Sequence, residues 1–438
     1  MKDAYFLYRG EEKISFTIPR EWKVIKHTCF NVEAPSTPIG DLVETALANP
    51  VGSPRLREMA NEKTTVAILV DDPARVTPVS TMLPPILSEL GEAGVPVENI
   101  TIVVALGTHR SASEKDLEIK LGKPVLDRYR VVQHDCHGDH LVPICRLSTG
   151  TEVAIDPFVA HAHIKIGVGS IFPHPMNGFG GGAKILFPGV SNFEAIKEHH
   201  FHYTPEPGCH LGNIETNPFY HEVCRVAEEA GLSFIVNCLF DARERVKEVV
   251  AGDFMQAHLH GIEKSKKEYA FSMEEPADVT ILSASPYEEG PQIIKPIIPA
   301  ALIATKPGGS VIVFAGCPDG MPEPMLQAFD AVFAARPEHT GRFAVNAFKS
   351  STLMAEGAID FNCALFFALV CAARTRVTIV SEDLDERTVK RLGFHYAPSL
   401  ETAIRNEQER KTEATVNIFP LGGLLLPIAP SLKTLYEF

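Results

Sequence analysis

The chain has 438 residues, of which 45% are hydrophobic and 22% are charged, a composition typical of a globular protein with large buried cores. The net charge of −14 argues against sequence-independent binding of nucleic acid and against binding to an anionic membrane surface. A chain of this length favours about two or three domains. None of the nine cysteines forms a C-x-x-C pair, which argues against a disulfide framework and favours the cytoplasm.

Runs rich in valine and isoleucine recur along the chain, and each is followed by a turn and a helical pattern. Continuous apolar strands that alternate with helices predict parallel sheets covered on both faces, so we expect an α/β protein. The apolar run around 364–373 is too short to span a bilayer and predicts a buried helix. The predicted strands are 65–70, 100–105, 163–168, 234–239, 279–282, 310–314 and 376–380.

A charged segment that ends at Pro276 suggests a domain boundary between 264 and 276. We therefore predict an N-terminal α/β domain over 1–270 and a C-terminal α/β domain over 277–400. The last segment, about 412–438, is apolar, and we expect it to pack back on the first domain.

Three consecutive loops that follow predicted strands carry chemically active side chains. The sequence DDPARVTP brings Asp72 and Arg75, LGTHRSASE brings His109, and HPMNGFGGGAKI brings His174 and Lys184. Ligands of parallel sheets bind beyond the carboxyl ends of the strands, so the three loops predict one composite site. Ser111 and Glu114 fit a capping box, which predicts a helix that begins just after His109.

The glycine-rich loop before Lys184 lets the backbone approach a bound group closely. The motif GGGAKI lacks the G-x-x-x-x-G-K-[ST] pattern, which argues against a P-loop nucleotide-binding protein. A lysine at the start of a helix opposes the helix dipole, so a role in phosphate binding or covalent chemistry explains it better than stability does.

Histidines are concentrated around this loop, since eleven of the 17 lie between His109 and His210. His199 and His200 are adjacent and would point about 100° apart on a helix, so only one of them is expected to face the site. The segment HDCHGDH, residues 134–140, contains metal-binding residue types, but we favour a solvated loop there.

These motifs together resemble the nickel-dependent lactate racemase family. The resemblance rests on DDPARVTP, GTHR, PHPMNGFGGGAKILFPG and a histidine sixteen residues after the lysine, and more loosely on QIIK and KPGGSVIVFAGCPDG. It implies two α/β domains with largely parallel sheets and an active site in the interdomain cleft. It also implies an isomerase that racemises or epimerises a small 2-hydroxy acid by reversible hydride transfer through a 2-keto acid.

The same resemblance implies a nickel-pincer cofactor, pyridinium-3,5-bisthiocarboxylic acid mononucleotide, made by separate maturation enzymes and joined covalently to Lys184. His200 is then the protein ligand of nickel, although the sequence alone does not decide between His199 and His200. His109 and His174 are the implied acid–base residues, and the carboxylate of the substrate would meet Arg75, Gln292 and Lys295. The other implied cofactor-binding residues are Asp72, Arg75, Gly107, Thr108, Gly180, Gly181 and Gly182.

Two departures from the family pattern predict a substrate other than lactate. Lactate-type members carry a tyrosine four residues before the carboxylate-binding lysine, where this chain has Pro291. They also carry a tryptophan in the second domain, whereas the single tryptophan here is Trp22. Two other interpretations stay open: an enzyme that uses a nucleotide or phosphate ligand without nickel, and a protein that only binds a small molecule or a metal. The oligomeric state is not predicted.

Overall fold

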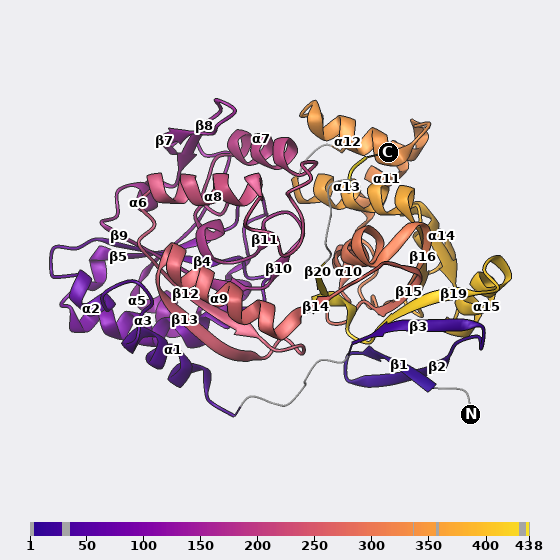
Figure 1. Ribbon diagram of the computed structural model, residues 1–438. Coiled ribbons are helices and arrows are strands. Elements are labelled where there is room, and N and C mark those ends of the chain that lie inside the picture. The colour runs from indigo at the N-terminus through magenta and orange to yellow at the C-terminus, as the bar shows by residue number, and fades with distance from the viewer. Residues whose placement is uncertain (1–3, 29–35, 336, 356–358, 429–434, 438) are drawn as a thin grey trace. The chain divides into compact units, whose positions relative to one another are not determined.

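The computed structural model describes residues 4–28, 36–335, 337–355, 359–428 and 435–437. The chain forms two compact units (Figure 1). The central unit consists of Val32–Tyr203 and Asn213–Glu268. The terminal unit contains both chain ends and consists of Met1–Asn31, Thr204–Gly212 and Tyr269–Phe438.

The central unit is built on a six-stranded sheet in the order β13-β12-β9-β4-β5-β6. All neighbouring strands are parallel except β13, which runs antiparallel to β12. Every residue of β5, β9 and β12 is buried, as expected for apolar strands covered on both faces. The strands of this sheet are β4 (Val66–Asp71), β5 (Ile100–Ala105), β6 (Arg130–Gln133), β9 (Ile164–Ile171), β12 (Phe234–Phe240) and β13 (Val246–Asp253).

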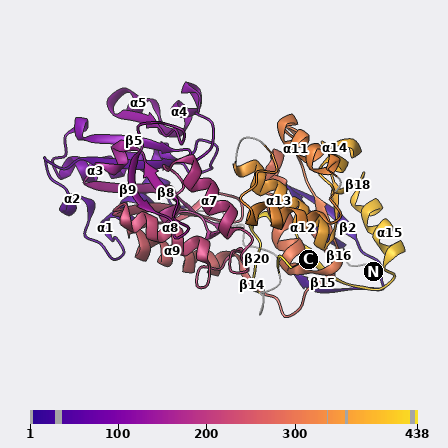
Figure 2. The same cartoon turned by 90° about the horizontal axis from the view of Figure 1, so that it is seen from above.

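Helices cover both faces of the central sheet (Figures 1 and 2). The apolar sides of α1, α2 and α3 pack with β4, β5 and β9 in one large hydrophobic core. The helices are α1 (Ile39–Ala48), α2 (Leu56–Met59), α3 (Val79–Glu92), α4 (Glu114–Leu121), α5 (Lys123–Arg128), α6 (Pro157–Ala160), α7 (Phe193–Tyr203), α8 (Pro218–Glu229) and α9 (Phe254–Tyr269). Shorter elements are η1 (Val97–Asn99), η2 (Gly182–Ile185) and two hairpins, β7 (Val142–Arg146) with β8 (Glu152–Ile155) and β10 (Pro173–His174) with β11 (Gly178–Phe179).

The helix predicted after His109 exists, but it begins later than its predicted capping box. Ser113, not Ser111, is the N-cap residue, because its backbone is extended and its hydroxyl accepts the Asp116 N–H at 3.2 Å. Asp116 therefore takes the place that the prediction gave to Glu114, and two more residues remain in the loop that carries His109.

The terminal unit is built on a second six-stranded sheet, entirely parallel, in the order β18-β17-β16-β15-β19-β3. The predicted buried helix around 364–373 is α13. The strands are β1 (Ala4–Arg9), β2 (Glu12–Thr17), β3 (Trp22–His27), β14 (Ala270–Ser272), β15 (Ala277–Ser283), β16 (Thr305–Phe314), β17 (Arg376–Val380), β18 (His395–Ala397), β19 (Ala414–Phe419) and β20 (Leu426–Ile428). The helices are η3 (Gly290–Ile293), α10 (Ile294–Pro299), η4 (Ala300–Ala304), α11 (Glu323–Ala334), α12 (Thr340–Lys349), α13 (Ile359–Arg374), α14 (Glu386–Arg391), α15 (Leu400–Arg410) and η5 (Gly422–Leu424).

The predicted domain division differs from these units at both ends of the chain. Residues 1–31, predicted in the first domain, belong to the terminal unit because β3 pairs with β19. The segment 412–438, expected to pack back on the first domain, also belongs to the terminal unit. The physical reason is that β19 is an apolar strand that lies between β15 and β3, inside the second sheet.

No helix in the described part of the chain has the length and apolarity that a membrane crossing needs. The eight cysteines within the described residues are all free thiols.

Candidate functional site

The order of strands in the central sheet brings the three predicted loops to one edge. β4 lies between β5 and β9, and Asp71 at the end of β4 is in register with Ala105 at the end of β5. Because these strands are parallel, the loops that follow them leave the sheet side by side. A hydrogen bond from the Gly107 N–H to the Gly189 carbonyl, 2.9 Å long, joins the second loop to the segment after Lys184.

His109 is held by a carboxylate from the neighbouring loop. Its Nδ1 lies 2.6 Å from Oδ2 of Asp72, and the two side chains are 31% and 13% exposed. Burial alone would raise the pKa of Asp72, but the hydrogen bonds from His109 and the Ala74 N–H, with the nearby charges of His109 and Arg75, lower it. The ionised carboxylate accepts the Nδ1 proton and leaves Nε2 as the nitrogen that can exchange a proton. Asp72, predicted to contact a nucleotide, thus has its carboxylate on His109.

Lys120, a residue that the sequence did not suggest, binds the backbone of the loop 71–78. The buried Lys120 amine donates to the carbonyl oxygens of Arg75 (2.9 Å) and Thr77 (3.1 Å) and pairs with Asp71 at 2.8 Å. Burial raises the pKa of Asp71, and Lys120 opposes that shift. Arg75 itself is exposed, so its guanidinium is available for an anionic ligand.

Replacing Lys120 by methionine is expected to cost about 3–5 kcal/mol of the free energy of unfolding, because Asp71 would be left as an unpaired buried carboxylate. Urea denaturation at neutral pH measures this loss. Lys123→Met is the matched control, since Lys123 and its partner Asp127 are both exposed and their pair is expected to matter little. Equal losses in the two variants would contradict the assigned role of Lys120.

Lys184 and His174 lie next to each other. The Nδ1 atom of His174 accepts the N–H groups of Met176 (3.2 Å) and Asn177 (3.1 Å), which orients the ring within the β10–β11 hairpin. Its other nitrogen, Nε2, lies 3.3 Å from Nζ of Lys184. Lys184 belongs to a single 3-10 turn, η2, and its amine lies 5.7 Å from the centre of the Phe219 ring.

The geometry of α7 distinguishes the two adjacent histidines. The Nδ1–H of His200 donates to the Ile196 carbonyl at 2.8 Å, which leaves the lone pair on Nε2. Burial, with the charge of Lys184, lowers the pKa of His200 to about 3, so the ring is neutral. A neutral imidazole with a lone pair on one nitrogen is the form that binds metals.

His199 is enclosed instead. It is fully buried, its Nε2–H donates to the Phe219 carbonyl at 3.2 Å, and aromatic rings of Phe187, Tyr203 and Phe219 surround it within 5.2 Å. Its Nδ1 has no hydrogen-bond partner among the described residues. The arrangement therefore favours His200 over His199 as the ligand.

No group of three or more histidine, cysteine, aspartate or glutamate side chains among the described residues could hold a metal ion. The histidines of segment 134–140 have structural contacts: His134 Nε2 lies 2.9 Å from the Ser191 carbonyl oxygen, and His137 stacks on Phe193. A metal bound by His200 would therefore have to take most of its ligands from a bound molecule.

Similarity to known proteins agrees with this arrangement. Residues 9–212 match the family model described as the lactate racemase N-terminal domain. Lactate racemases of Thermoanaerobacterium thermosaccharolyticum and Lactiplantibacillus plantarum are each 30% identical to this chain over 284 residues, which are 64% of this chain and 66% of each relative. This chain belongs to the lactate racemase family. The aligned stretch spans just under two thirds of the length of these curated relatives.

The fold extends beyond that stretch. The structure of the lactate racemase apoprotein from Thermoanaerobacterium thermosaccharolyticum superposes with a TM-score of 0.84 at 24% identity, covering 97% of this chain and 100% of that one. A crystal structure of a protein from Thermotoga maritima gives a TM-score of 0.61 at 16% identity, covering 91% and 100%. The predicted family and the predicted α/β class are confirmed.

Two of the three predicted carboxylate-binding residues of this lactate racemase family member, Gln292 and Lys295, lie together in the terminal unit, whereas Arg75 belongs to the central unit. The Lys295 amine donates to Oε1 of Gln292 at 3.1 Å, on the short helices that follow β15. The same amine lies 4.4 Å from the centre of the Tyr287 ring. Thr108 is half-buried beside His109 in the central unit.

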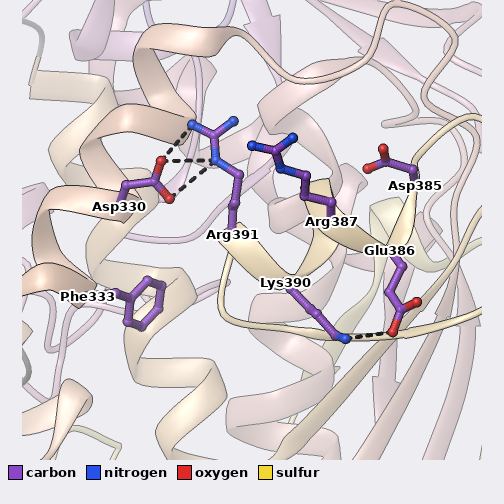
Figure 3. Close-up of a pocket in the computed structure, with 7 residues that line it drawn as sticks. All are labelled: Asp330, Phe333, Asp385, Glu386, Arg387, Lys390 and Arg391. Carbon is purple, nitrogen blue, oxygen red and sulfur yellow. Dashed lines mark hydrogen bonds and ion pairs between the residues drawn. The ribbon is translucent and has the colours of Figure 1, made fainter.

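A hollow elsewhere in the terminal unit contains none of the predicted site residues (Figure 3). Its charges are largely balanced by ion pairs, in which Arg391 meets Asp330 at 2.7 Å and Lys390 meets Glu386 at 2.6 Å. We assign it no role in the chemistry of this family member.

The start of α8 contributes contacts to the site that the sequence analysis missed. Asn217 caps the helix and donates from Nδ2 to the Met176 carbonyl at 2.8 Å, which ties α8 to the hairpin of His174. Phe219 places its ring against His200, with a centroid distance of 5.0 Å, and against the Lys184 amine. The signal was present, because Asn followed by Pro is a typical helix start.

Proposed function

We propose that this protein is a racemase or epimerase of a 2-hydroxy acid other than lactate, and that it uses a nickel-pincer nucleotide joined to Lys184. The observation that carries the proposal is the 3.3 Å approach of the Lys184 amine to His174 on a loop beside the Asp72–His109 pair. Lys184 thus offers an attachment point next to one oriented imidazole, on a loop that neighbours the loops of the other. The two relatives compared above are lactate racemases, which supports the same reaction class.

The residues present fit the proposed cofactor. Lys184 offers a primary amine at the end of a glycine loop, where Gly181 and Gly182 have positive φ angles of 74° and 56°. His200 offers a neutral Nε2 as a single protein ligand for nickel. When bound, the cofactor would supply the acceptor and the donor of the hydride at C2 of the substrate.

The protein's own task is then to move one proton and to bind the carboxylate. The hydroxyl proton of the substrate passes to an imidazole and returns from it, and imidazole suits both directions because its ordinary pKa is near neutrality. Asp72 orients His109 for this transfer, and two backbone N–H groups orient His174. We propose that Arg75, Gln292 and Lys295 bind the substrate carboxylate, for which Arg75 can supply a bidentate contact.

Several features of the terminal unit support a substrate other than lactate. Pro291 supplies no aromatic ring or hydroxyl where lactate-type members carry tyrosine, and Tyr287 instead lies against Lys295. Trp22 does not replace the missing tryptophan, because it pairs with Ala414 at the start of β19, whereas Gln292 and Lys295 follow the end of β15. Parallel strands all start at one end of the sheet and finish at the other, so Trp22 lies at the end of the sheet opposite to Gln292 and Lys295.

The test is to produce the protein together with the cofactor maturation enzymes and to measure its intact mass, its nickel content and its activity on a panel of 2-hydroxy acids. We expect a covalent adduct on Lys184, stoichiometric nickel, and racemisation of another 2-hydroxy acid about tenfold or more faster than lactate. A chain without adduct or nickel would contradict the cofactor assignment. A preference for lactate would contradict the substrate assignment alone.

A further inference from the structure

Two buried side chains from distant parts of the chain hold the glycine loop that precedes Lys184. His258, on α9, has its Nε2 2.9 Å from the Gly180 carbonyl oxygen. Asn237, on β12, accepts the Gly182 N–H on Oδ1 at 2.8 Å. Both side chains are 1% exposed, and none of the roles described above involves them.

The hydrogen bonds of His258 assign a proton to each of its contacts. A carbonyl oxygen can only accept, so the Nε2–H donates to Gly180. Nδ1 then carries the lone pair, and the hydroxyl of Tyr220 lies 3.3 Å from it as the donor. Burial lowers the pKa of His258 to about 4, although the Gly180 carbonyl opposes the shift, which agrees with a neutral ring.

The loop lies directly against these two side chains. A Cβ atom at position 182 would come within 2.5 Å of the His258 ring, and one at position 181 within 2.8 Å of Oδ1 of Asn237. The positive φ angles of Gly181 and Gly182 allow this path. The ring of His258 therefore occupies the space that any side chain at position 182 would need.

The position of Gly180 affects both the hairpin of His174 and the turn that carries Lys184. The Gly180 N–H donates to the Phe172 carbonyl at 2.8 Å, which joins the loop to the residue just before the His174 hairpin. Gly182 begins the η2 turn, in which the Lys184 N–H donates to the Gly181 carbonyl at 3.2 Å. A shift of Gly180 would thus move Lys184 relative to His174.

We propose that His258 is a positioning residue for Lys184: through its hydrogen bond to Gly180 and its contact with Gly182, it holds the Lys184 amine beside His174. Tyr220 supports it by donating to the other ring nitrogen. The inference rests on the proposed function only for the reason why Lys184 must be held in place. The position of the amine itself can be measured without cofactor.

The experiment compares His258→Phe, which keeps a ring but has no N–H, with His258→Gln, whose amide can still donate to Gly180. Apoprotein is treated with limiting acetic anhydride, and acetylation of Lys184 is measured by peptide mass spectrometry relative to the exposed Lys123. Because Nδ1 of His174 already accepts two N–H groups, its Nε2 carries the proton and can donate only to a neutral amine. This contact favours the neutral, reactive form of Lys184, so displacement of Lys184 should slow its acetylation. We expect a decrease of roughly three- to tenfold in His258→Phe, with partial recovery in His258→Gln.

Two further variants keep the test decisive. His260→Phe changes an exposed histidine on the same helix and should leave Lys184 acetylation unchanged. Tyr220→Phe removes only the hydroxyl that supports His258, so it answers the question even where His258→Phe fails to fold, and a smaller decrease is expected. Folded His258→Phe and Tyr220→Phe proteins with wild-type acetylation of Lys184 would overturn the inference, as would a His258→Gln protein no better than His258→Phe.

A second readout separates this inference from the proposed function. After production with the maturation enzymes, the fraction of chains with an adduct on Lys184 should fall in the same order as the acetylation rates. If wild-type protein carries no adduct, the proposed function fails, whereas the acetylation series still decides whether His258 positions Lys184.

Discussion

Lys184→Arg protein produced with the maturation enzymes is expected to carry no covalent adduct and to racemise its substrate no faster than the background reaction. A guanidinium stays protonated up to a pH above about 12, so it keeps the positive charge but cannot act as the nucleophile that joins the cofactor. His200 alone would then have to retain nickel, and one imidazole is a weak site. Intact mass, nickel content and chiral chromatography of the product measure the three losses.

The matched control is Lys115→Arg, an exposed position on α4 that should keep adduct, nickel and activity. Circular dichroism shows whether Lys184→Arg protein is folded, since Lys184 is half-buried and packs over Phe219. An adduct that persists in the Lys184→Arg protein would place the attachment on another residue.

The apolar runs predicted the inner strands of both sheets except β19, for a physical reason. A parallel strand covered on both faces needs apolar residues at every position, and such a run is visible without knowledge of its partners. Thus β5 occupies 100–105 and β17 occupies 376–380, as predicted. The place of β3 could not be found in this way, because it is half-exposed at the sheet edge and its partner β19 is almost 400 residues away.

The candidate site was also predictable only in part. Its loops were predictable because they follow recognisable strands, and the position of a loop at a strand end is a topological rule. Lys120, Asn237 and His258 were not predictable, since each acts through a bond to backbone atoms 43 to 78 residues away. No local pattern distinguishes such a residue from an ordinary polar side chain on a helix or strand. The choice between His199 and His200 likewise needed the acceptor of each ring N–H.

His109→Ala and His174→Ala are each expected to lower the rate of racemisation by about 10²- to 10⁴-fold, the range for loss of a general acid–base group. The two variants should nevertheless differ in one respect. If the imidazoles serve opposite enantiomers, each variant still oxidises one enantiomer to the 2-keto acid, and the two variants retain opposite ones. Incubation of loaded enzyme with a single enantiomer, followed by acid quench and measurement of the 2-keto acid, shows which is oxidised.

His161→Ala provides the control and should keep full activity, because His161 is an exposed histidine of the same unit whose Nδ1 contacts the Pro157 carbonyl. Asp72→Asn should resemble His109→Ala rather than His174→Ala, since Asp72 accepts the Nδ1 proton of His109 and an amide holds that ring less well. This pairing makes the prediction specific. If His109→Ala or His174→Ala still oxidised both enantiomers at the wild-type rate, the substituted histidine would have no acid–base role. If Asp72→Asn retained the enantiomer that His174→Ala retains, Asp72 would not act through His109.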